Sequence, residues 1–211
     1  MDIGLFGGTF NPLHNGHLGI IQHVKEEFRL QEIILFPSSS PPHKSVRDLA
    51  PAQDRLEMIQ ASVKDMEGFR ASDIEVQRKG LSFTIDTVRA FQSASKDRFF
   101  LLMGSDAFFD INTWKSKDQI FRIIPIIVMV RKASGHRPTF ASFIDENIST
   151  GYKKEESRFT HSQMQDIIIC HVPKIDISST MIRDRIKQKI SIHGLVPAPV
   201  EEIIKKRDLY I

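Results

Sequence analysis

Short apolar runs alternate along this chain with stretches in which apolar residues recur at helical spacing. Six runs predict β-strands, at residues 2–6, 32–37, 69–77, 98–103, 125–131 and 166–172. Between the first two runs, Leu18, Ile21, Val24 and Phe28 follow at steps of three and four, which predicts an amphipathic helix over about residues 16–29. Strands that alternate with helices are typical of βαβ units, so the pattern predicts an α/β fold with a parallel sheet.

The same helical spacing predicts further helices at residues 56–66, 85–91, 179–189 and 199–206. The segment 133–165 is polar and irregular and contains Pro138 and Gly151, so we expect only loops and short helices there. A chain of 211 residues is long enough to bury one sizeable core, and it has no internal repeat. We therefore expect a single domain that spans residues 1–211.

Composition and charge exclude several classes of protein. The hydrophobic fraction of 41% and the charged fraction of 26% are near the averages of globular proteins, so disorder is not indicated. The net charge of +3 is small and the basic residues are scattered, which argues against a nucleic-acid partner. No apolar run is as long as a bilayer span, and the start MDIGLFGG has no basic segment or cleavage site, so we expect a cytoplasmic protein without a membrane partner. The single cysteine, Cys170, lies in an apolar run and is expected to be a buried, inert thiol.

A glycine-rich segment, GGTFNPLHNGH at residues 7–17, joins the first predicted strand to the first predicted helix. Glycines at such a turn let backbone N–H groups approach an anion, and the helix start adds a favourable dipole. The segment matches neither a Walker A loop nor the G-x-G-x-x-G pattern. In open parallel sheets, ligands bind beyond the carboxyl ends of the strands, which is where this segment lies. We therefore expect it to bind phosphate.

His14 and His17 are three residues apart at the start of the predicted helix, so their rings can lie on the same side. Two imidazoles there can donate hydrogen bonds to phosphate oxygens as charge builds up during an in-line displacement. Two alternatives stay open at this point. The pair could cap the helix structurally, or it could supply two ligands of a zinc site.

Read as a whole, GGTFNPLHNGH resembles the N-terminal signature of the HxGH nucleotidylyltransferase superfamily. The resemblance implies an α/β, Rossmann-like, doubly wound parallel sheet with helices on both faces. It also implies that His14 and His17 contact the triphosphate of ATP and stabilise the transition state. Class I aminoacyl-tRNA synthetases carry a related motif, but this chain is too short for one. The phosphate-binding residues implied in the first motif are Gly7, Gly8, Thr9 and Phe10.

Further segments are similar to bacterial nicotinate-nucleotide adenylyltransferases. The run P-P-H-K ends at His43 and Lys44, which by the resemblance face nucleotide phosphates, His43 on the mononucleotide side and Lys44 on the ATP side. The stretch S-F-T-I-D-T contains Thr84, which the resemblance implies binds the nicotinate carboxylate together with backbone N–H groups. A helix start suits a carboxylate better than an amide, which favours the acid form of the mononucleotide. Trp114, the only tryptophan, is implied to line the nicotinate ring.

The remaining similar segments are implied to bind ATP. G-x-D places Gly104 and Asp106 at the ribose or adenosine, and Arg131 is retained although the family's Arg-Pro-Gly is replaced by Arg-Lys-Ala here. The run I-S-S-T-M-I-R lies at the start of a predicted helix, so the helical part from about residue 178 is expected to contribute to the ATP site. Its phosphate-binding residues are implied to be Ser178, Ser179, Thr180 and Arg183.

The resemblance implies one reaction, in which the 5′-phosphate of nicotinate mononucleotide attacks the α-phosphorus of ATP. The products are nicotinate adenine dinucleotide and pyrophosphate. Mg²⁺ is expected on the triphosphate rather than on protein side chains, because it prefers phosphate oxygens and water. The expected partners are the two small substrates, and a homo-oligomer is plausible for such a fold.

Four alternatives stay open. The acceptor could be nicotinamide mononucleotide, alone or beside the acid, because the two differ by one group. Phosphopantetheine enzymes resemble the first motif but lack the P-P-H-K and S-F-T-x-x-T segments in this arrangement. A nucleotide-binding sensor without turnover is a third alternative, although His14, His17 and Arg183 are intact. A structural metal-binding protein built on the two histidines is the fourth, and it predicts a bound transition metal.

Overall fold

The computed structural model describes residues 1–39, 49–78, 80–131 and 138–211. These divide into two compact units. The first unit comprises Met1–Leu5 and Phe83–Lys174, and the second comprises Phe6–Ser82 and Ile175–Ile211. Strand β1 (Asp2–Gly8) starts in the first unit and ends in the second.

The sheet of the first unit has the strand order β1-β4-β5-β8-β7-β6. The start of β1, β4 (Arg98–Gly104), β5 (Ile126–Val130) and β8 (Ile167–His171) run parallel, whereas β7 and β6 continue the sheet as an antiparallel hairpin. All five residues of β5 are buried, as expected for a central parallel strand covered on both faces. The hairpin strands are β6 (Lys153–Glu155) and β7 (Arg158–Thr160).

Helices of the first unit follow its strands and pack through aromatic rings. They are α3 (Thr84–Ala94), α4 (Ser105–Phe109), the 3-10 helix η2 (Ile111–Thr113), α5 (Lys117–Ile123) and α6 (Phe140–Asn147). Phe108 is fully buried, and its ring lies 5.5–6.4 Å, between centroids, from the rings of Phe109, Phe121, Phe140 and Phe143. This aromatic cluster joins α4, α5 and α6 because each of these helices contributes at least one ring.

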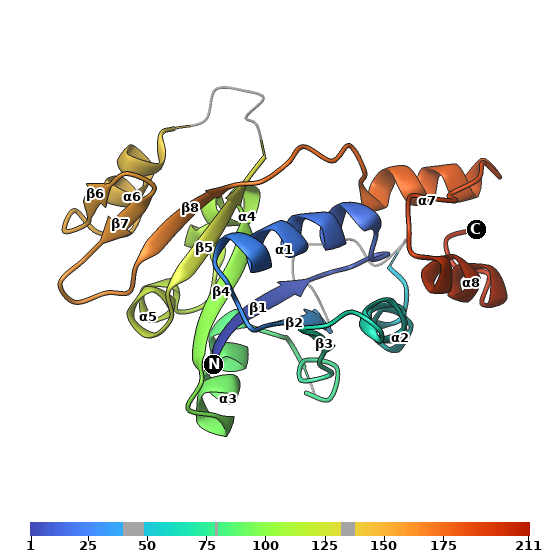
Figure 1. The fold of residues 1–211 in the computed structure, drawn as a ribbon, viewed down its shortest axis with the longest axis horizontal. Helices are drawn as coiled ribbons and strands as arrows, with labels where there is room; N and C mark the ends of the chain where they lie inside the picture. Colours follow the sequence, from blue (N-terminus) through green and yellow to red (C-terminus); the bar gives the residue numbers. More distant parts are fainter. Residues whose placement is uncertain (40–48, 79, 132–137) are drawn as a thin grey trace. The chain divides into compact units, whose positions relative to one another are not determined.

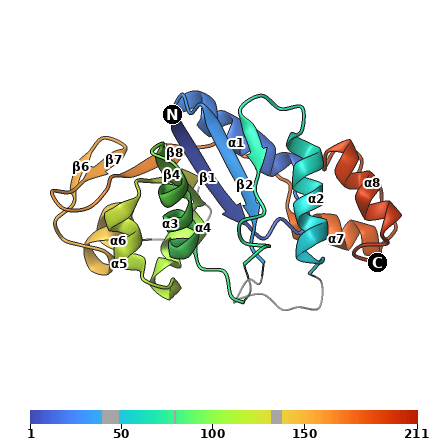
Figure 2. The ribbon, with the colours of Figure 1, turned by 90° about the horizontal axis from the view of Figure 1, so that it is seen from below.

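The second unit contains the end of β1, the parallel strands β2 (Glu32–Pro37) and β3 (Phe69–Ala71), and, among its described residues, four α-helices. The helices are α1 (Asn15–Glu27), α2 (Ala52–Val63), α7 (Ser179–Lys187) and α8 (Ala198–Lys206). Figures 1 and 2 both show α2 beside α8, with α7 next to them. One apolar cluster joins the three helices, and its buried members are Met58, Ile182, Ile192, Val196, Val200 and Ile204. The C-terminal segment is thereby packed onto α2.

The predicted α/β class with a mostly parallel sheet is confirmed, and read through β1 the strand order is β3-β2-β1-β4-β5. The predicted strand 69–77 is too long. It ends at Ala71 because the next residues fold into a turn, in which the backbone N–H of Gln77 donates to the carbonyl oxygen of Asp73 at 2.9 Å. The expectation of loops and short helices for 133–165 is confirmed for α6 but missed the β6–β7 hairpin, whose first strand is wholly exposed and therefore carries no apolar alternation.

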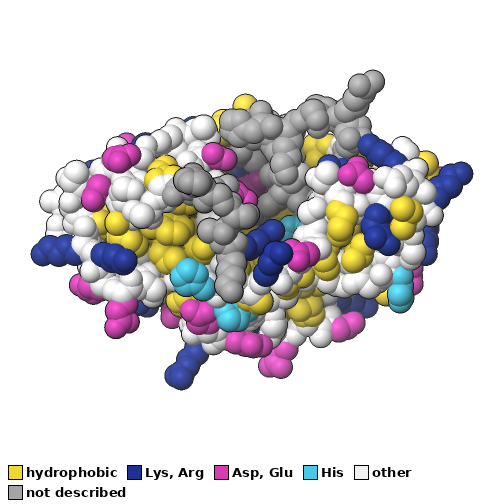
Figure 3. Space-filling model, turned by 90° about the horizontal axis from the view of Figure 1, so that it is seen from above, with side chains coloured by type: hydrophobic (Ala, Val, Ile, Leu, Met, Phe, Trp, Pro, Cys, Tyr) yellow, Lys and Arg dark blue, Asp and Glu magenta, His cyan; other side chains and the backbone are white. Residues whose placement is uncertain are grey.

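The charged side chains on one face of the molecule are of both signs. Lysine and arginine side chains are interspersed with aspartate and glutamate side chains on the face shown in Figure 3, without a large field of one sign. No helix among the described residues is long and apolar enough to cross a membrane.

Candidate active site

The glycine-rich turn begins where β1 ends in the second unit. A Cβ on Gly7 would lie 2.5 Å from Cε2 of the buried Phe36, so only glycine fits this close approach to β2. Ser38 donates its backbone N–H to the carbonyl oxygen of Gly8 at 2.8 Å, which ties the turn to the end of β2. Phe10 has a φ of 46°, in the left-handed region that residues with side chains seldom adopt, and its ring is buried. The turn is therefore a defined, strained structure.

His14 and His17 form a reciprocal cap at the start of α1. The backbone N–H of His17 donates to Nδ1 of His14 at 3.2 Å, and the backbone N–H of His14 donates to Nδ1 of His17 at 3.3 Å. This arrangement is a capping box in which both side-chain acceptors are imidazoles. A neutral imidazole that accepts at Nδ1 carries its proton on Nε2, so the caps select the same tautomer in both rings.

The two rings are stacked, with centroids 3.6 Å apart and planes 21° from parallel. The edge-on ring of Phe10 lies 5.2 Å from His17, between centroids. His14 is almost fully buried, whereas His17 is half-buried. The prediction that the two rings lie on the same side is confirmed. The alternative that they cap the helix is also correct, because Nδ1 of each ring accepts a backbone N–H group.

The zinc alternative gains no support from the described part of the chain. There, no group of three side chains with ligand atoms close enough to share a metal ion includes His14 or His17.

The segment I-S-S-T-M-I-R packs directly against the histidine motif. Ser178 caps α7 by accepting the backbone N–H of Met181 at 3.2 Å. Ser179 donates from Oγ to the carbonyl oxygen of Pro12 at 2.9 Å, and Arg183 donates from one terminal nitrogen to the carbonyl oxygen of Asn11 at 3.0 Å. These two segments, which are distant in the sequence, are therefore in direct contact.

The guanidinium of Arg183 has further donors besides the one bound to Asn11. Its second terminal nitrogen lies 3.4 Å from Oγ1 of Thr180. Its Nε is buried and has no hydrogen-bond partner among the described residues. Buried donors without partners are rare because they are costly, and one way to satisfy such a donor is a bound anion.

In the first unit, the structure brings the segments of Thr84 and Trp114 together. Thr84 is the first residue of α3, so backbone N–H groups of the first helical turn lie beside it. Nζ of Lys115, the residue after Trp114, lies 3.2 Å from Oδ2 of Asp86 and 4.4 Å from the centroid of the Phe83 ring. Trp114 itself is half-buried and ends η2.

Three other predicted residues also lie in the first unit, each at the carboxyl end of a strand. Gly104 is the last residue of β4 and the N-cap of α4, and Asp106 lies exposed in the first turn of α4. Arg131 directly follows β5 and is exposed. His43 and Lys44 lie outside the described residues.

Comparisons with known proteins match most or all of this chain. A family model described as cytidylyltransferase-like matches residues 5–185. A relative from Desulfatibacillum aliphaticivorans is 38% identical over all of both chains, and one from Caldicellulosiruptor bescii is 39% identical over 100% of this chain and 99% of its own. Both carry the name "Probable nicotinate-nucleotide adenylyltransferase". The chain belongs to the nicotinate-nucleotide adenylyltransferase family.

A solved structure agrees with this membership at the level of the fold. Plasmodium falciparum nicotinic acid mononucleotide adenylyltransferase, complexed with NaAD, superimposes with a TM-score of 0.74. The superposition covers 99% of this chain and 97% of the other, at 18% identity. The resemblance inferred from the HxGH motif is thus confirmed for the family and for the Rossmann-like fold.

Sequence reasoning missed two residues of this adenylyltransferase-family protein that contact the glycine-rich turn: Arg55 and Tyr210. Arg55 donates from one terminal nitrogen to the carbonyl oxygens of Thr9 at 2.8 Å and Ser38 at 2.7 Å, and Tyr210 donates to Oδ1 of Asn11 at 2.9 Å. Arg55 is four residues before the buried Ile59, on the apolar face of α2. A charged residue in an apolar helical stripe was the available signal.

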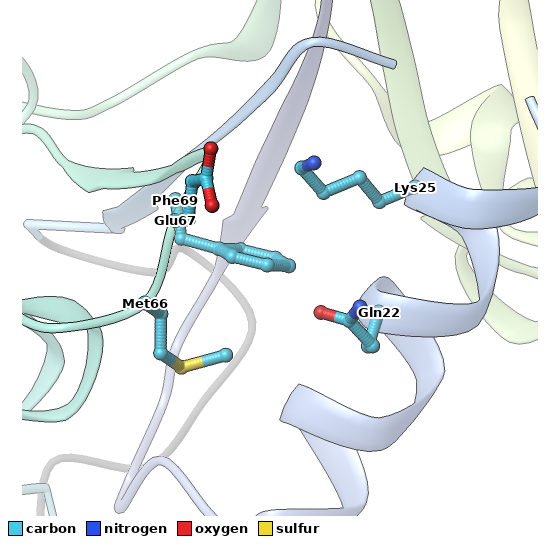
Figure 4. Close-up of a pocket in the computed structure, with 5 residues that line it drawn as sticks. All are labelled: Gln22, Lys25, Met66, Glu67 and Phe69. Carbon is cyan, nitrogen blue, oxygen red and sulfur yellow. The ribbon is translucent and has the colours of Figure 1, made fainter. Parts of the chain in front are cut away.

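A hollow of about 520 Å³ in the second unit is separate from these residues. Figure 4 shows Gln22 and Lys25 projecting from α1 toward Met66, Glu67 and Phe69. Phe69 is the first residue of β3, so the hollow lies toward the amino ends of the strands, opposite the glycine-rich turn. None of the predicted site residues lines it.

Proposed function

We propose that the protein transfers the adenylyl group of ATP to nicotinate mononucleotide. A 5′-phosphate oxygen of the mononucleotide forms the new bond to the α-phosphorus. The bond from that phosphorus to the oxygen bridging to the β-phosphorus breaks, and the products are nicotinate adenine dinucleotide and pyrophosphate. The observation that carries the proposal is the stacked His14–His17 pair at the glycine-rich turn, in which both Nδ1 atoms accept backbone N–H groups.

The histidines act as oriented hydrogen-bond donors in this mechanism. A proton on Nδ1 would break the cap, so each ring carries its proton on Nε2 and can direct that N–H toward a non-bridging phosphate oxygen. Negative charge on those oxygens grows during the displacement, and donors that are already in place need no reorganisation. His14 and His17 therefore stabilise the transition state without forming a covalent intermediate.

The triphosphate of Mg·ATP is held by the turn and by the start of α7. Backbone N–H groups of Gly7, Gly8, Thr9 and Phe10 supply neutral donors, together with the hydroxyls of Ser178 and Thr180. The hydroxyl of Ser179 donates to the carbonyl oxygen of Pro12, so Ser179 is proposed to offer its backbone N–H at the start of α7. Arg183 adds a permanent positive charge, and its buried Nε is the donor that a phosphate oxygen would satisfy. Lys44 is proposed as a further cation, and Gly104, Asp106 and Arg131 as contacts of the adenosine half.

Nicotinate recognition is assigned to Thr84, Trp114 and His43. The first turn of α3 offers backbone N–H groups and a positive dipole end, which favour a carboxylate over a neutral amide. Asp86 in that turn would repel the carboxylate, but Lys115 forms an ion pair with it at 3.2 Å and offsets its charge. Trp114 supplies an aromatic face for the pyridine ring.

Pyrophosphate release from Mg·ATP tests the proposal, with nicotinate mononucleotide and nicotinamide mononucleotide as separate acceptors. We expect rapid release with the acid, weak release with the amide, and a loss of roughly 100-fold or more in His17→Ala. His193→Ala is the matched control, because His193 is an exposed histidine of the same unit, and its Nδ1 lies 3.5 Å from a carboxylate oxygen of Glu201. Equal rates with both acceptors would contradict the acid preference. No release with either would leave phosphopantetheine transfer or a sensor role, and would refute the proposal.

A further inference from the structure

Arg55 is a buried cation directly behind the glycine-rich turn. Its side chain has no exposed surface, and its hydrogen bonds to the described residues all go to backbone carbonyl oxygens. One terminal nitrogen donates to Thr9 in the turn and to Ser38 after β2. The other terminal nitrogen donates to Ser39 at 3.2 Å, and Nε donates to Ala50 at 2.9 Å. Arg55 therefore joins the turn to the end of β2 and to the residue two before α2.

Tyr210 supplies a second fixed donor to the same turn. Its hydroxyl donates to Oδ1 of Asn11 at 2.9 Å, and the same oxygen accepts the backbone N–H of Ala50 at 2.9 Å. Asn11 is itself buried, and its carbonyl oxygen accepts from Arg183. The side chains of Arg55 and Tyr210 thus hold the residues immediately before and after Phe10.

Phe10 is the residue at which this restraint has an effect. Its φ of 46° is unfavourable for a residue with a side chain, so surrounding contacts must maintain it. The ring held in this conformation meets His17 edge-on at 5.2 Å between centroids. Relaxation of Phe10 would therefore move the packing partner of the half-buried histidine.

The same bonds orient the peptide planes of the turn. In a trans peptide, the N–H group points away from the C=O group of the same plane. Because Arg55 holds the carbonyl oxygen of Thr9, the N–H of Phe10 is directed away from α2. Ser179 does the same to the carbonyl oxygen of Pro12, which directs the N–H of Leu13 away from α7. The N–H groups of Phe10 and Leu13 are thus each directed away from the donor that holds the preceding carbonyl oxygen.

We propose that Arg55 and Tyr210 are positioning residues, which set the conformation of the turn at Phe10 and, through its ring, the orientation of the histidine pair. This inference rests on the proposed function for its effect on catalysis. Burial lowers the pKa of Arg55, but an arginine stays charged across the neutral range, so the carbonyl oxygens face a permanent cation. Burial also raises the pKa of Tyr210, which keeps its hydroxyl protonated and able to donate.

Tyr210→Phe is the sharpest test, because it removes one hydroxyl and leaves the ring in place. Tyr152→Phe is the matched control: Tyr152 is the other tyrosine, and its buried hydroxyl donates to the carbonyl oxygen of Gln165 at 2.8 Å in the first unit. For Arg55, the lysine variant keeps the charge but cannot reach all four carbonyl oxygens. Arg70→Met is the control for Arg55→Met, since Arg70 pairs with Glu32 at the start of β2, at 2.9 Å.

Two readouts are needed: kcat for pyrophosphate release per folded molecule, and long-range ¹H–¹⁵N spectra of the imidazole nitrogens. We expect Tyr210→Phe to lower kcat about tenfold with little change in the KM for ATP, because small displacements of catalytic groups are costly. Two histidine spin systems should shift in Tyr210→Phe and not in Tyr152→Phe. Arg55→Lys should lie between wild type and Arg55→Met in kcat.

Unchanged kcat in Tyr210→Phe and Arg55→Lys would overturn the proposal, as would unchanged imidazole spectra. A fall in melting temperature alone, equal in the two tyrosine variants, would also overturn it, since that is the signature of a purely structural hydroxyl. If the wild-type protein released no pyrophosphate with any acceptor, the proposed function would fail. The imidazole spectra would then still decide whether Arg55 and Tyr210 position the histidines.

Discussion

Replacing Gly16 by alanine separates helix stability from the geometry of the histidine pair. Gly16 lies between the two histidines in the first turn of α1 and is buried. A Cβ at this position would lie 3.0 Å from Nδ1 and 3.1 Å from Cε1 of His14, and 3.4 Å from Cβ of Ile177. His14 is almost fully buried and cannot swing into solvent, so its ring must shift by a few tenths of an ångström.

Two opposing terms then nearly cancel in the free energy of unfolding. Alanine is favoured over glycine in a helix by up to about 1 kcal/mol. The shift of the His14 ring weakens the 3.2 Å bond from the backbone N–H of His17, and loss of a side-chain cap costs about 1 kcal/mol. We therefore expect little change in stability. Catalysis has no compensating gain, and kcat should fall about tenfold to hundredfold because both donors are misplaced.

The assay compares kcat for pyrophosphate release with the midpoint of urea unfolding. Gly19→Ala is the matched control, since it introduces the same group one turn later in the same helix. Its new Cβ would meet Cδ1 of Ile175 at 2.7 Å, the far end of a flexible side chain that can turn away. Gly19→Ala should keep kcat near the wild-type value. A Gly16→Ala protein with wild-type kcat would refute the argument that the close approach at His14 sets the donor geometry.

Three further outcomes are expected. Lys115→Met leaves the Asp86 carboxylate in the first turn of α3 without its ion pair, so Asp86 should repel the nicotinate carboxylate. The ratio of kcat/KM for the acid to kcat/KM for the amide should then fall about fivefold, whereas Lys117→Met should leave this ratio unchanged. Arg183→Lys keeps the charge but loses the guanidinium fork, so initial rates should show the KM for Mg·ATP raised about tenfold. Burial raises the pKa of Tyr152 and Tyr210, so the unfolded chain releases these protons first and stability, measured by urea unfolding, should fall above about pH 10.

The elements that sequence predicted well are those whose apolar residues face one core. The strand predicted at residues 32–37 agrees with β2, in which five of the six residues are buried. The predicted strand at 69–77 was too long because Ile74 and Val76 continue the apolar alternation after the ladder has ended. Alternation reports which side chains are apolar, whereas the turn at Asp73 depends on local hydrogen bonds.

The residues of the candidate site also differ in how well the sequence predicts them. Glycines, histidines and hydroxyls in a contiguous motif carry a recognisable signal, and the structure brings the first motif and the segment around Ser179 into contact. Arg55 and Tyr210 belong to no such motif, because their roles depend on oxygens that are distant in the sequence. Thr9 lies 46 positions from Arg55, and Asn11 lies 199 positions from Tyr210. Only the folded chain shows that these donors point at the turn.

The two histidines can cap the helix and act in catalysis at the same time, although the sequence alone presents these roles as alternatives. An imidazole has two nitrogens, and the cap engages Nδ1 in both rings. Engaging Nδ1 places the proton on Nε2 and restricts rotation about the side-chain bonds, which is what an oriented donor to phosphate requires. The capping box therefore supplies the tautomer and the orientation that the proposed transfer uses. By this reasoning, a substitution that spares the imidazoles but breaks the cap should be nearly as harmful as one that removes a ring.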